Sequence, residues 1–432
     1  MQRILILATL AALVAGSALS AGDEIPGAPQ RQPIALINAT IHTAVGAPIS
    51  NATLVFDKGV ITAVGASAQI PDGARTVDCK GARVYPGFIA PSTTLGLTEI
   101  DAVRSTRDFG EVGSLNPNAR AETAYNPDSE IIPTVRSNGV LLVNSTPQGG
   151  LVSGQSSLMR LDGWTREDLA VKRVSGLILS WPAMEITTAW WQRKSADEQR
   201  KDIEQNVRQV YDLFTAARGY SEKARAGVDT SLRDIRFEAM RCVFEDSVPV
   251  IVECATRRQI ESVLDFAQTM NVRVILSGAV DAPLVLEQLQ RAGVGIIIPR
   301  VHALPRREED GYDAAFTLPA TLAKAGIPFA FSDDGAWQQR NLPFHAGTAR
   351  AFGMSELDAL RGLTLWPAQL FGVAATYGSL EVGKSATLFV STGDAMDSKS
   401  NNVIHAFIDG RELELNNRHK RLAKKYRERS KR

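Results

Sequence analysis

The sequence predicts an α/β protein: a (β/α)8, TIM-like barrel with a small composite β-sandwich domain built from the N- and C-terminal segments. Short apolar runs alternate with helix-like stretches through the middle of the 432-residue chain. Such alternation is typical of parallel strands joined by helices. Short β-rich runs separated by turn residues occur near both ends of the chain. We therefore expect the two ends to pair with each other in one β unit.

The N-terminal half of this β unit lies between Pro33 and Arg83. Turn signals such as Asp-Lys-Gly at 57–59 and Pro-Asp-Gly at 71–73 separate its candidate strands, since these residues favour tight turns. The candidate strands cover residues 34–37, 53–56, 60–64 and 76–78. Matching runs near the C-terminus cover residues 386–390 and 403–409. We assign residues 21–83 and 365–412 to the composite β-sandwich.

The middle of the chain, residues 84–364, is predicted to form the barrel. Several of its strand-like runs are apolar almost throughout, as strands buried on both faces must be. Seven candidate strands cover residues 84–89, 140–144, 177–180, 248–252, 272–276, 295–298 and 329–332, and helix-like segments cover 259–270, 283–292 and 318–325. No eighth strand is evident between Trp181 and Asp246, where charged helical stretches dominate.

Two long segments interrupt this pattern. Residues 93–164 show little periodicity before Val140, so we predict a long loop that caps the carboxyl-end mouth of the barrel. Residues 193–247 are rich in charged side chains and predict exposed helices.

The N-terminus predicts export. Arg3 precedes an apolar run over residues 4–15, and small residues follow. This pattern is typical of a signal peptide over residues 1–20. An uncleaved anchor is the alternative, but the run is shorter than the ~20 residues that span a bilayer. We expect a secreted or periplasmic protein with no membrane span.

Composition excludes few functions. Apolar residues make up 44% of the chain and charged residues 22%, and the net charge is +1. A near-neutral chain has no global field for nucleic acid, so we predict no nucleic-acid partner. A small-molecule ligand and an oligomer stay open. The cysteines Cys79, Cys242 and Cys254 have no metal-type or disulfide-framework spacing.

The tail at residues 413–432 is strongly basic, with Glu428 as the one acid after Asn416. A solvated, partly helical tail is our first interpretation. Docking on an anionic lipid or polymer and folding back onto a mildly acidic body are the alternatives.

Two motifs carry a family resemblance. Residues 84–96 read VYPGFIAPSTTLG, and residues 357–390 contain LTLWPAQLFG followed by GSLEVGKSATLFV. Together they resemble the amidohydrolase superfamily, with the imidazolonepropionase-like exported amidohydrolases as the closest group. The resemblance implies a metal-dependent barrel hydrolase that acts on non-peptide carbon–nitrogen bonds. In this family a His-x-His pair on the first strand and further residues on later strands hold a catalytic metal.

Most of those ligand positions carry other residues here. Ser92 and Thr94 stand where the histidine pair would be, and Glu253 stands where a later histidine would fall. Hydroxyl groups are poor zinc ligands compared with imidazole. Asp334, in the run FSDDG, matches the family's aspartate and is our candidate catalytic residue, with Asp333 just before it. Resident metal ligands are therefore predicted to be absent, and the cofactor prediction is none.

Other residues offer a way to rebuild a site. His302 and His345 both follow predicted barrel strands. With Glu253, Ser92 and Thr94 they are candidate binding residues at the mouth, and with Asp334 they could hold zinc or another divalent metal. Packing of His345 within its turn and a loop position for His302 are the structural alternatives.

Three functions follow from these observations. The first is a carbon–nitrogen bond hydrolase, as the resemblance implies. The second is a catalytically inactive relative that binds a ligand or supports a partner. The third is a metal-free reaction at Asp334 and Glu253.

Overall fold

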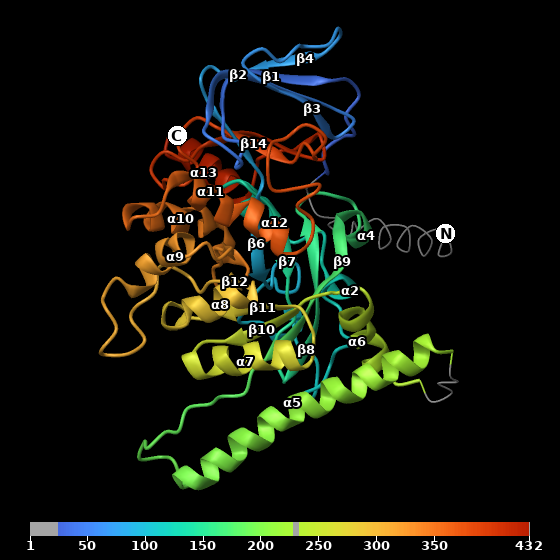
Figure 1. Ribbon diagram of the computed structural model, residues 1–432. Helices are drawn as coiled ribbons and strands as arrows, with labels where there is room; N and C mark the ends of the chain where they lie inside the picture. Colours follow the sequence, from blue (N-terminus) through green and yellow to red (C-terminus); the bar gives the residue numbers. More distant parts are fainter. Residues whose placement is uncertain (1–24, 228–232, 432) are drawn as a thin grey trace, which may run out of the picture.

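The computed structural model describes residues 25–227 and 233–431 as a mixed α/β fold with two eight-stranded sheets. Figure 1 shows one sheet at the top of the molecule and the other below it, with a long helix across the lower edge. We call the upper sheet the terminal sheet and the lower one the barrel sheet. The predicted signal peptide at residues 1–20 lies outside the described residues.

The terminal sheet joins the two ends of the chain. Its central pair is antiparallel, with Leu388 opposite Pro86 and Val390 opposite Val84. The strand order is β16 (Arg411–Glu412), β15 (Val403–Ile408), β14 (Leu388–Ser391), β5 (Arg83–Pro86), β1 (Ile34–Ile41), β2 (Ile49–Asp57) and β3 (Val60–Gly65), and β4 (Arg75–Asp78) pairs with β1. The strands predicted at the two ends therefore pair with each other.

The terminal sheet has its own apolar core. Leu36, Phe56 and Phe407 are fully buried in it, and the rings of Phe56 and Phe407 meet edge to face with centroids 5.0 Å apart. Inward-facing apolar residues from strands near both chain ends supply this core, since alternate residues of a strand share one face.

The barrel sheet is nearly barrel-shaped. Its strand order is β13 (Phe329–Ala330), β12 (Gly295–Ile297), β11 (Val274–Gly278), β10 (Val250–Cys254), β9 (Ala170–Ser180), β8 (Val152–Arg160), β7 (Val140–Ser145) and β6 (Phe88–Thr93). Thr93, the last residue of the edge strand β6, donates through Oγ1 to the carbonyl of Gly335, which follows the other edge strand β13, at 2.8 Å. Side-chain bonding therefore brings β6 and the segment after β13 together.

The strand missing from the sequence prediction is β8. It lies inside the segment 93–164 that we expected to be a loop, and it runs antiparallel to both β7 and β9. Its side chains explain why it was missed, because Ser156 and Ser157 are buried although polar. Ser156 Oγ lies 2.9 Å from Ser175 Oγ, and Ser157 Oγ donates to the carbonyl of Arg173 at 2.7 Å. Polar residues satisfied in this way leave no apolar pattern in the sequence.

The helices lie mostly where periodicity placed them. The charged region 193–247 forms α5 (Ala196–Arg225) and α6 (Ile235–Glu245), and its described residues contain no barrel strand, in line with the absence of a strand pattern there. Ser195 and Glu198 form a capping box that starts α5. The remaining helices are α2 (Ala121–Ala124), α3 (Ile131–Arg136), α4 (Arg166–Leu169), α7 (Arg257–Thr269), α8 (Leu286–Ala292), α9 (Ala314–Lys324), α10 (Leu342–Ala351), α11 (Glu356–Leu363), α12 (Leu365–Leu370) and α13 (Arg418–Arg429), with 3-10 turns at Arg104–Thr106, Ala282–Leu284 and Trp337–Asn341. Among the described residues no helix is long and apolar enough to cross a membrane.

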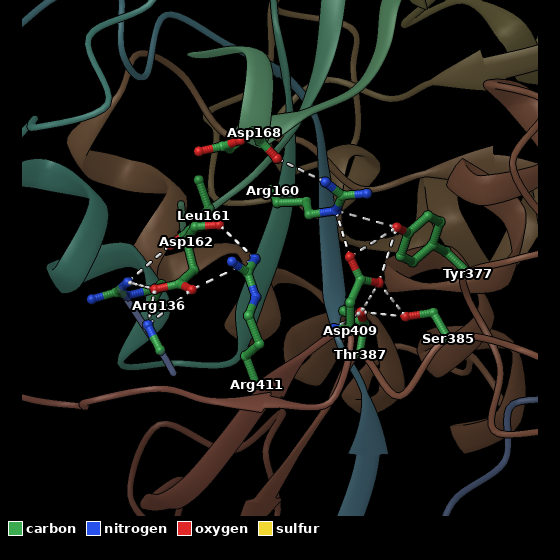
Figure 2. A network of polar contacts seen from close by, with 11 residues as sticks. Arg136, Arg160, Leu161, Asp162, Asp168, Tyr377, Ser385, Thr387, Asp409 and Arg411 are labelled. Atoms are coloured by element: carbon green, nitrogen blue, oxygen red, sulfur yellow. Dashed lines mark hydrogen bonds and ion pairs between the residues drawn. The ribbon is translucent and has the colours of Figure 1, made fainter. Parts of the chain in front are cut away.

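A polar network fastens the two sheets together (Figure 2). Arg160, the last residue of β8, places Nε 2.6 Å from Oδ2 of Asp409, which follows β15 in the terminal sheet. The hydroxyls of Tyr377 and Ser385 also donate to this carboxylate, at 3.1 and 2.6 Å. Thr387, which stands where the resembled family has an aspartate, accepts a hydrogen bond from the Asp409 backbone N–H at 3.1 Å.

A second part of the network centres on Asp162. Its carboxylate lies 3.3 Å from Nη1 of Arg136, and Arg411 of β16 donates to its backbone carbonyl at 3.0 Å. Burial is the main cause that raises the pKa of Asp162, and the two arginines oppose it. The carboxylate also accepts the backbone N–H of Gly27 at 3.2 Å. The segment before β1 is thereby tied to the junction of the two sheets.

His42 gives the fold a pH dependence. Its side chain is 5% exposed, stacks on Tyr85 with ring centroids 4.4 Å apart, and places Nδ1 3.6 Å from Glu356. Burial lowers the pKa of His42 below the ordinary 6.5, although Glu356 and Asp394 oppose the shift, while Arg83 and Arg350 add to it. The unfolded chain therefore binds this proton more readily, so the stability contribution is full above pH 6.5 and is lost as the pH falls below it. We expect urea denaturation to give a lower free energy of unfolding at about pH 5.5 than at about pH 7.5.

The His42→Gln variant should show a smaller difference in the free energy of unfolding between the two pH values. The control is His419→Gln, since His419 is exposed on α13. The expectation fails if the two variants lose stability equally between the two pH values.

Candidate binding site at the barrel mouth

A cavity of about 480 Å³ opens where strands of the barrel sheet end. It lies beyond the carboxyl ends of β6, β11, β12 and β13, where barrel enzymes place their sites. The lining residues are Ser92, Thr93, Thr94, Asp101, Phe109, Gln148, Ser277, Gly278, Ile298, Pro299, Ser332, Asp333, Asp334 and Gly335. Asp101, Phe109 and Gln148 belong to the segment 93–164, so this segment forms one wall of the mouth.

Two predicted binding residues lie in this cavity. Ser92 is the fifth residue of β6 and Thr94 directly follows the strand, so their spacing of two places them on the same side of the chain. Ser92 Oγ lies 3.4 Å from Thr146 Oγ1, within reach of a weak hydrogen bond. Ser277, near the end of β11, adds a third hydroxyl to the lining.

The two aspartates after β13 differ in environment. Asp334, our predicted catalytic residue, is on the cavity lining, but its side chain is 73% exposed and lies 3.3 Å from Arg300. Asp333 is only 7% exposed, and its Oδ2 lies 2.9 Å from Nε2 of His345. Its Oδ1 accepts the backbone N–H of Asp334 at 2.8 Å. Asp333 is thus the fixed carboxylate of the cavity.

The two histidines lie behind the cavity. His345 is on α10 and 1% exposed, and its Nδ1 accepts the backbone N–H of His302 at 3.4 Å. The two rings lie 4.4 Å apart, and His302 Nε2 is 2.7 Å from Thr348 Oγ1. Burial chiefly lowers the pKa of His302, and His345 adds to the shift. His302 lines a separate outer groove of about 820 Å³, beside α10 and residues 394–398.

Glu253 is set apart from the cavity. It lies in β10 opposite Ser277 of β11, but its exposed side chain accepts a hydrogen bond from Ser180 at 2.6 Å, and it is not among the residues that line the mouth. The predicted site residues therefore lie in three different places. The structure brings Ser92, Thr94 and Asp334 to one cavity, links His302 and His345 behind it, and leaves Glu253 outside.

The donor set at the mouth does not fit the metal centre that the resemblance implies. Within residues 25–227 and 233–431 no three His, Cys, Asp or Glu side chains are grouped to hold a metal. The strand ends offer hydroxyl groups at positions 92, 94 and 277 instead, and zinc prefers imidazole, thiolate and carboxylate ligands. What this cavity offers chemically is hydrogen bonding and negative charge.

The lining favours a particular kind of ligand. Asp101, Asp333 and Asp334 bring carboxylates, and the described lining contains no Lys or Arg. Carboxylates accept hydrogen bonds and attract cations. The arrangement therefore suits a neutral or cationic molecule that carries N–H donors, in a volume typical of small-molecule sites.

Comparison with known proteins gives one partial family match and several similar folds. A sequence model of the Amidohydrolase family matches residues 239–413. No curated protein sequence matches the chain. An amidohydrolase from Thermotoga maritima MSB8 shares the fold at a TM-score of 0.77 and 23% identity, over 88% of this chain and 99% of that one.

Two further solved structures share the fold less closely. One is a molinate hydrolase, with a TM-score of 0.55 and 16% identity over 91% of this chain and 96% of that one. The other is a prolidase complexed with N-methylphosphonate-L-proline, with a TM-score of 0.55 and 14% identity over 89% of this chain and all of that one. Residues 239–413 thus match the amidohydrolase family model, and the chain shares its fold with solved amidohydrolases.

Proposed function

We propose that the mouth cavity binds a small neutral or cationic molecule with N–H donors, such as an amide, a urea or an amine, and that this binding is the principal function of the chain. The observation that carries the proposal is the lining, which combines Ser92, Thr94 and Ser277 with the fixed carboxylate of Asp333. These groups can accept hydrogen bonds from a ligand without a metal.

The position of Asp333 supports preorganised binding. One of its oxygens accepts a backbone N–H, and the other lies 2.9 Å from the Nε2 atom of His345. A ligand therefore meets a carboxylate whose orientation is already set, which reduces the entropy cost of binding. His345 acts as a positioning residue in this arrangement, since it contacts the carboxylate and does not line the cavity.

A second candidate is hydrolysis of a non-peptide carbon–nitrogen bond at the same cavity. It is favoured by the position of Asp334, which matches the family aspartate in sequence and lies on the lining. In this case a carboxylate accepts a proton as water adds to the carbonyl carbon, the carbon–nitrogen bond breaks, and the nitrogen leaves with a proton. The molinate hydrolase and the prolidase among the similar folds are named for hydrolytic reactions.

The remaining sequence predictions extend this proposal. We propose that residues 1–20 direct export to a periplasmic or extracellular location. We also propose that the two sheets correspond to a (β/α)8-type barrel and a composite β-sandwich, with β8 as the inserted antiparallel strand. A role in supporting a partner enzyme is the corresponding proposal for a chain without catalysis.

A ligand screen after chelation tests the binding proposal. The full chain is treated with a chelator, its metal content is measured by elemental analysis, and its Tm is recorded with small amides, ureas and amines. We expect substoichiometric metal and at least one compound that raises Tm by about 3 °C or more near 100-fold its Kd. The Thr94→Trp variant should lose this response, because indole would fill the cavity.

The matched control is Thr188→Trp, since Thr188 is exposed outside the cavity. Retention of the response by Thr94→Trp would show that the ligand binds elsewhere. About one tightly held metal per chain, with release of an amine or acid product detected by mass spectrometry, would instead establish the hydrolase function.

A further inference from the structure

The basic helix α13 lies at the surface, with Arg421 half-buried and its other residues exposed. None of its residues is buried. It carries seven Lys and Arg side chains and one acid, Glu428, whereas the whole chain is only +1. The rest of the chain is therefore acidic. In the described part, a single ion pair joins α13 to that acidic body: Arg421 Nη2 lies 3.0 Å from Oε2 of Glu130.

The first turn of α13 is firmly attached to the body. Asn417 is buried and caps the helix by accepting the backbone N–H of Lys420. The ring of His419 stacks on Trp337 with centroids 5.9 Å apart. Lys420 Nζ donates to the carbonyl of Leu415 at 2.7 Å. The start of the helix is thus fixed in direction, and its later cations project without a carboxylate partner among the described ion pairs.

Two apolar side chains of α13 lie next to each other on the helix surface. Leu422 is 39% exposed and Tyr426 is 59% exposed. They are one turn apart, so they form a continuous strip. At about 100° per residue, Tyr426 lies well around the helix from Arg421, which faces Glu130. Lys425 and Arg429 lie along one edge of the strip, whereas Arg427 lies about 100° beyond Tyr426 on the other side.

We propose that α13 is a docking surface for an anionic lipid bilayer. An exposed helix with Lys and Arg beside a narrow apolar strip is the arrangement of interfacial helices, whose cations meet anionic headgroups while the strip enters the headgroup boundary. The strip favours lipid over a soluble polyanion such as nucleic acid, because a polyanion has no apolar layer to receive Leu422 and Tyr426. This surface lies apart from the mouth cavity, and the inference does not depend on the proposed ligand.

Vesicle sedimentation tests the proposal. The full chain is mixed with vesicles of phosphatidylcholine alone and with vesicles that contain about one quarter phosphatidylglycerol. We expect tighter binding to the anionic vesicles at about 0.05 M salt and loss of the difference at about 0.5 M salt. The double variant Lys425→Glu, Arg429→Glu should reduce the phosphatidylglycerol-dependent binding about 10-fold or more.

The apolar strip has its own test. The double variant Leu422→Ser, Tyr426→Ser should weaken binding to anionic vesicles about 5-fold or more while keeping the salt dependence. The matched control is Leu304→Ser, because Leu304 is 88% exposed elsewhere in the chain. All variants contain the apolar run at residues 4–15, so any vesicle binding by this run contributes equally to each measurement.

Two outcomes would overturn the proposal. One is equal binding of the wild-type chain to both kinds of vesicle. The other is unchanged vesicle binding after loss of Leu422 and Tyr426, together with equally tight binding of duplex DNA, which would make α13 a polyanion surface. Circular dichroism of each variant checks that α13 and the body stay folded.

Discussion

The Asp333→Ala variant should unfold with a free energy about 3–5 kcal/mol below that of the wild type. Asp333 and His345 are both nearly fully buried, with 7% and 2% of their side chains exposed, and their facing atoms lie 2.9 Å apart. Alanine removes the carboxylate that lies against the Nε2 atom of His345, and removing one member of a buried polar contact leaves the other in the interior without it. The measurement is chemical denaturation near neutral pH.

The neighbouring residue supplies the control. Asp334→Ala should change the free energy of unfolding by less than about 1 kcal/mol, because its pairing with Arg300 is on the surface. A double-mutant cycle with His345→Gln isolates the pair. Equal losses for Asp333→Ala and Asp334→Ala would show that the buried contact does not stabilise the fold. If Asp333→Ala also abolishes a ligand response found for the wild type, the same carboxylate serves both stability and binding.

The Gly347→Ala variant should be destabilised by about 3 kcal/mol. In most helices this change is favourable by about 1 kcal/mol, because alanine has the higher helix propensity. Here a Cβ at position 347 would lie 2.0 Å from the backbone oxygen of Met396. That carbonyl cannot move aside freely, since Asp394 beside it is held by Arg350 at 2.7 Å and by Arg83 at 3.5 Å. The steric cost therefore exceeds the gain in propensity.

Gly219→Ala provides a comparison of opposite sign. Gly219 lies in α5, and a Cβ there would meet nothing within 4 Å. We expect this variant to gain about 0.5–1 kcal/mol. Thermal and urea denaturation of the two variants should thus shift in opposite directions. A stabilised Gly347→Ala variant would mean that α10 and residues 394–398 are not in close contact in solution.

The sequence predicted the parts of the fold that depend on apolar patterning. The parallel strands β10–β13 and the paired chain ends carry that pattern, and the structure contains them near the predicted residues. The strand β8 was missed because Ser156 and Ser157 are buried with hydrogen-bond partners. No periodicity rule identifies a strand whose buried residues are polar, since burial there depends on partners from other strands.

The sequence places some of the candidate site residues better than others, for a similar reason. The two-residue spacing of Ser92 and Thr94 is a local property, and both residues line the cavity. The choice between Asp333 and Asp334 depends on the turn after β13 and on His345, which lies on α10. A run of two aspartates gives no sign of which one faces inward. The side chain of Glu253 bonds to Ser180 on the neighbouring strand, a contact between strands that the local sequence does not reveal.

The pairing of β5 with β14 also sets the order in which the chain can fold. These strands lie roughly 300 residues apart in sequence, so the ladder between them cannot form until most of the chain has been made. During synthesis, β1, β2 and β5 are made long before β14 and β15. Their apolar core residues therefore stay exposed until the C-terminal strands have been added. A chain that ends before residue 388 would lack this partner and leave a sheet edge open to association. The terminal sheet can therefore assemble only after synthesis of the chain is nearly complete.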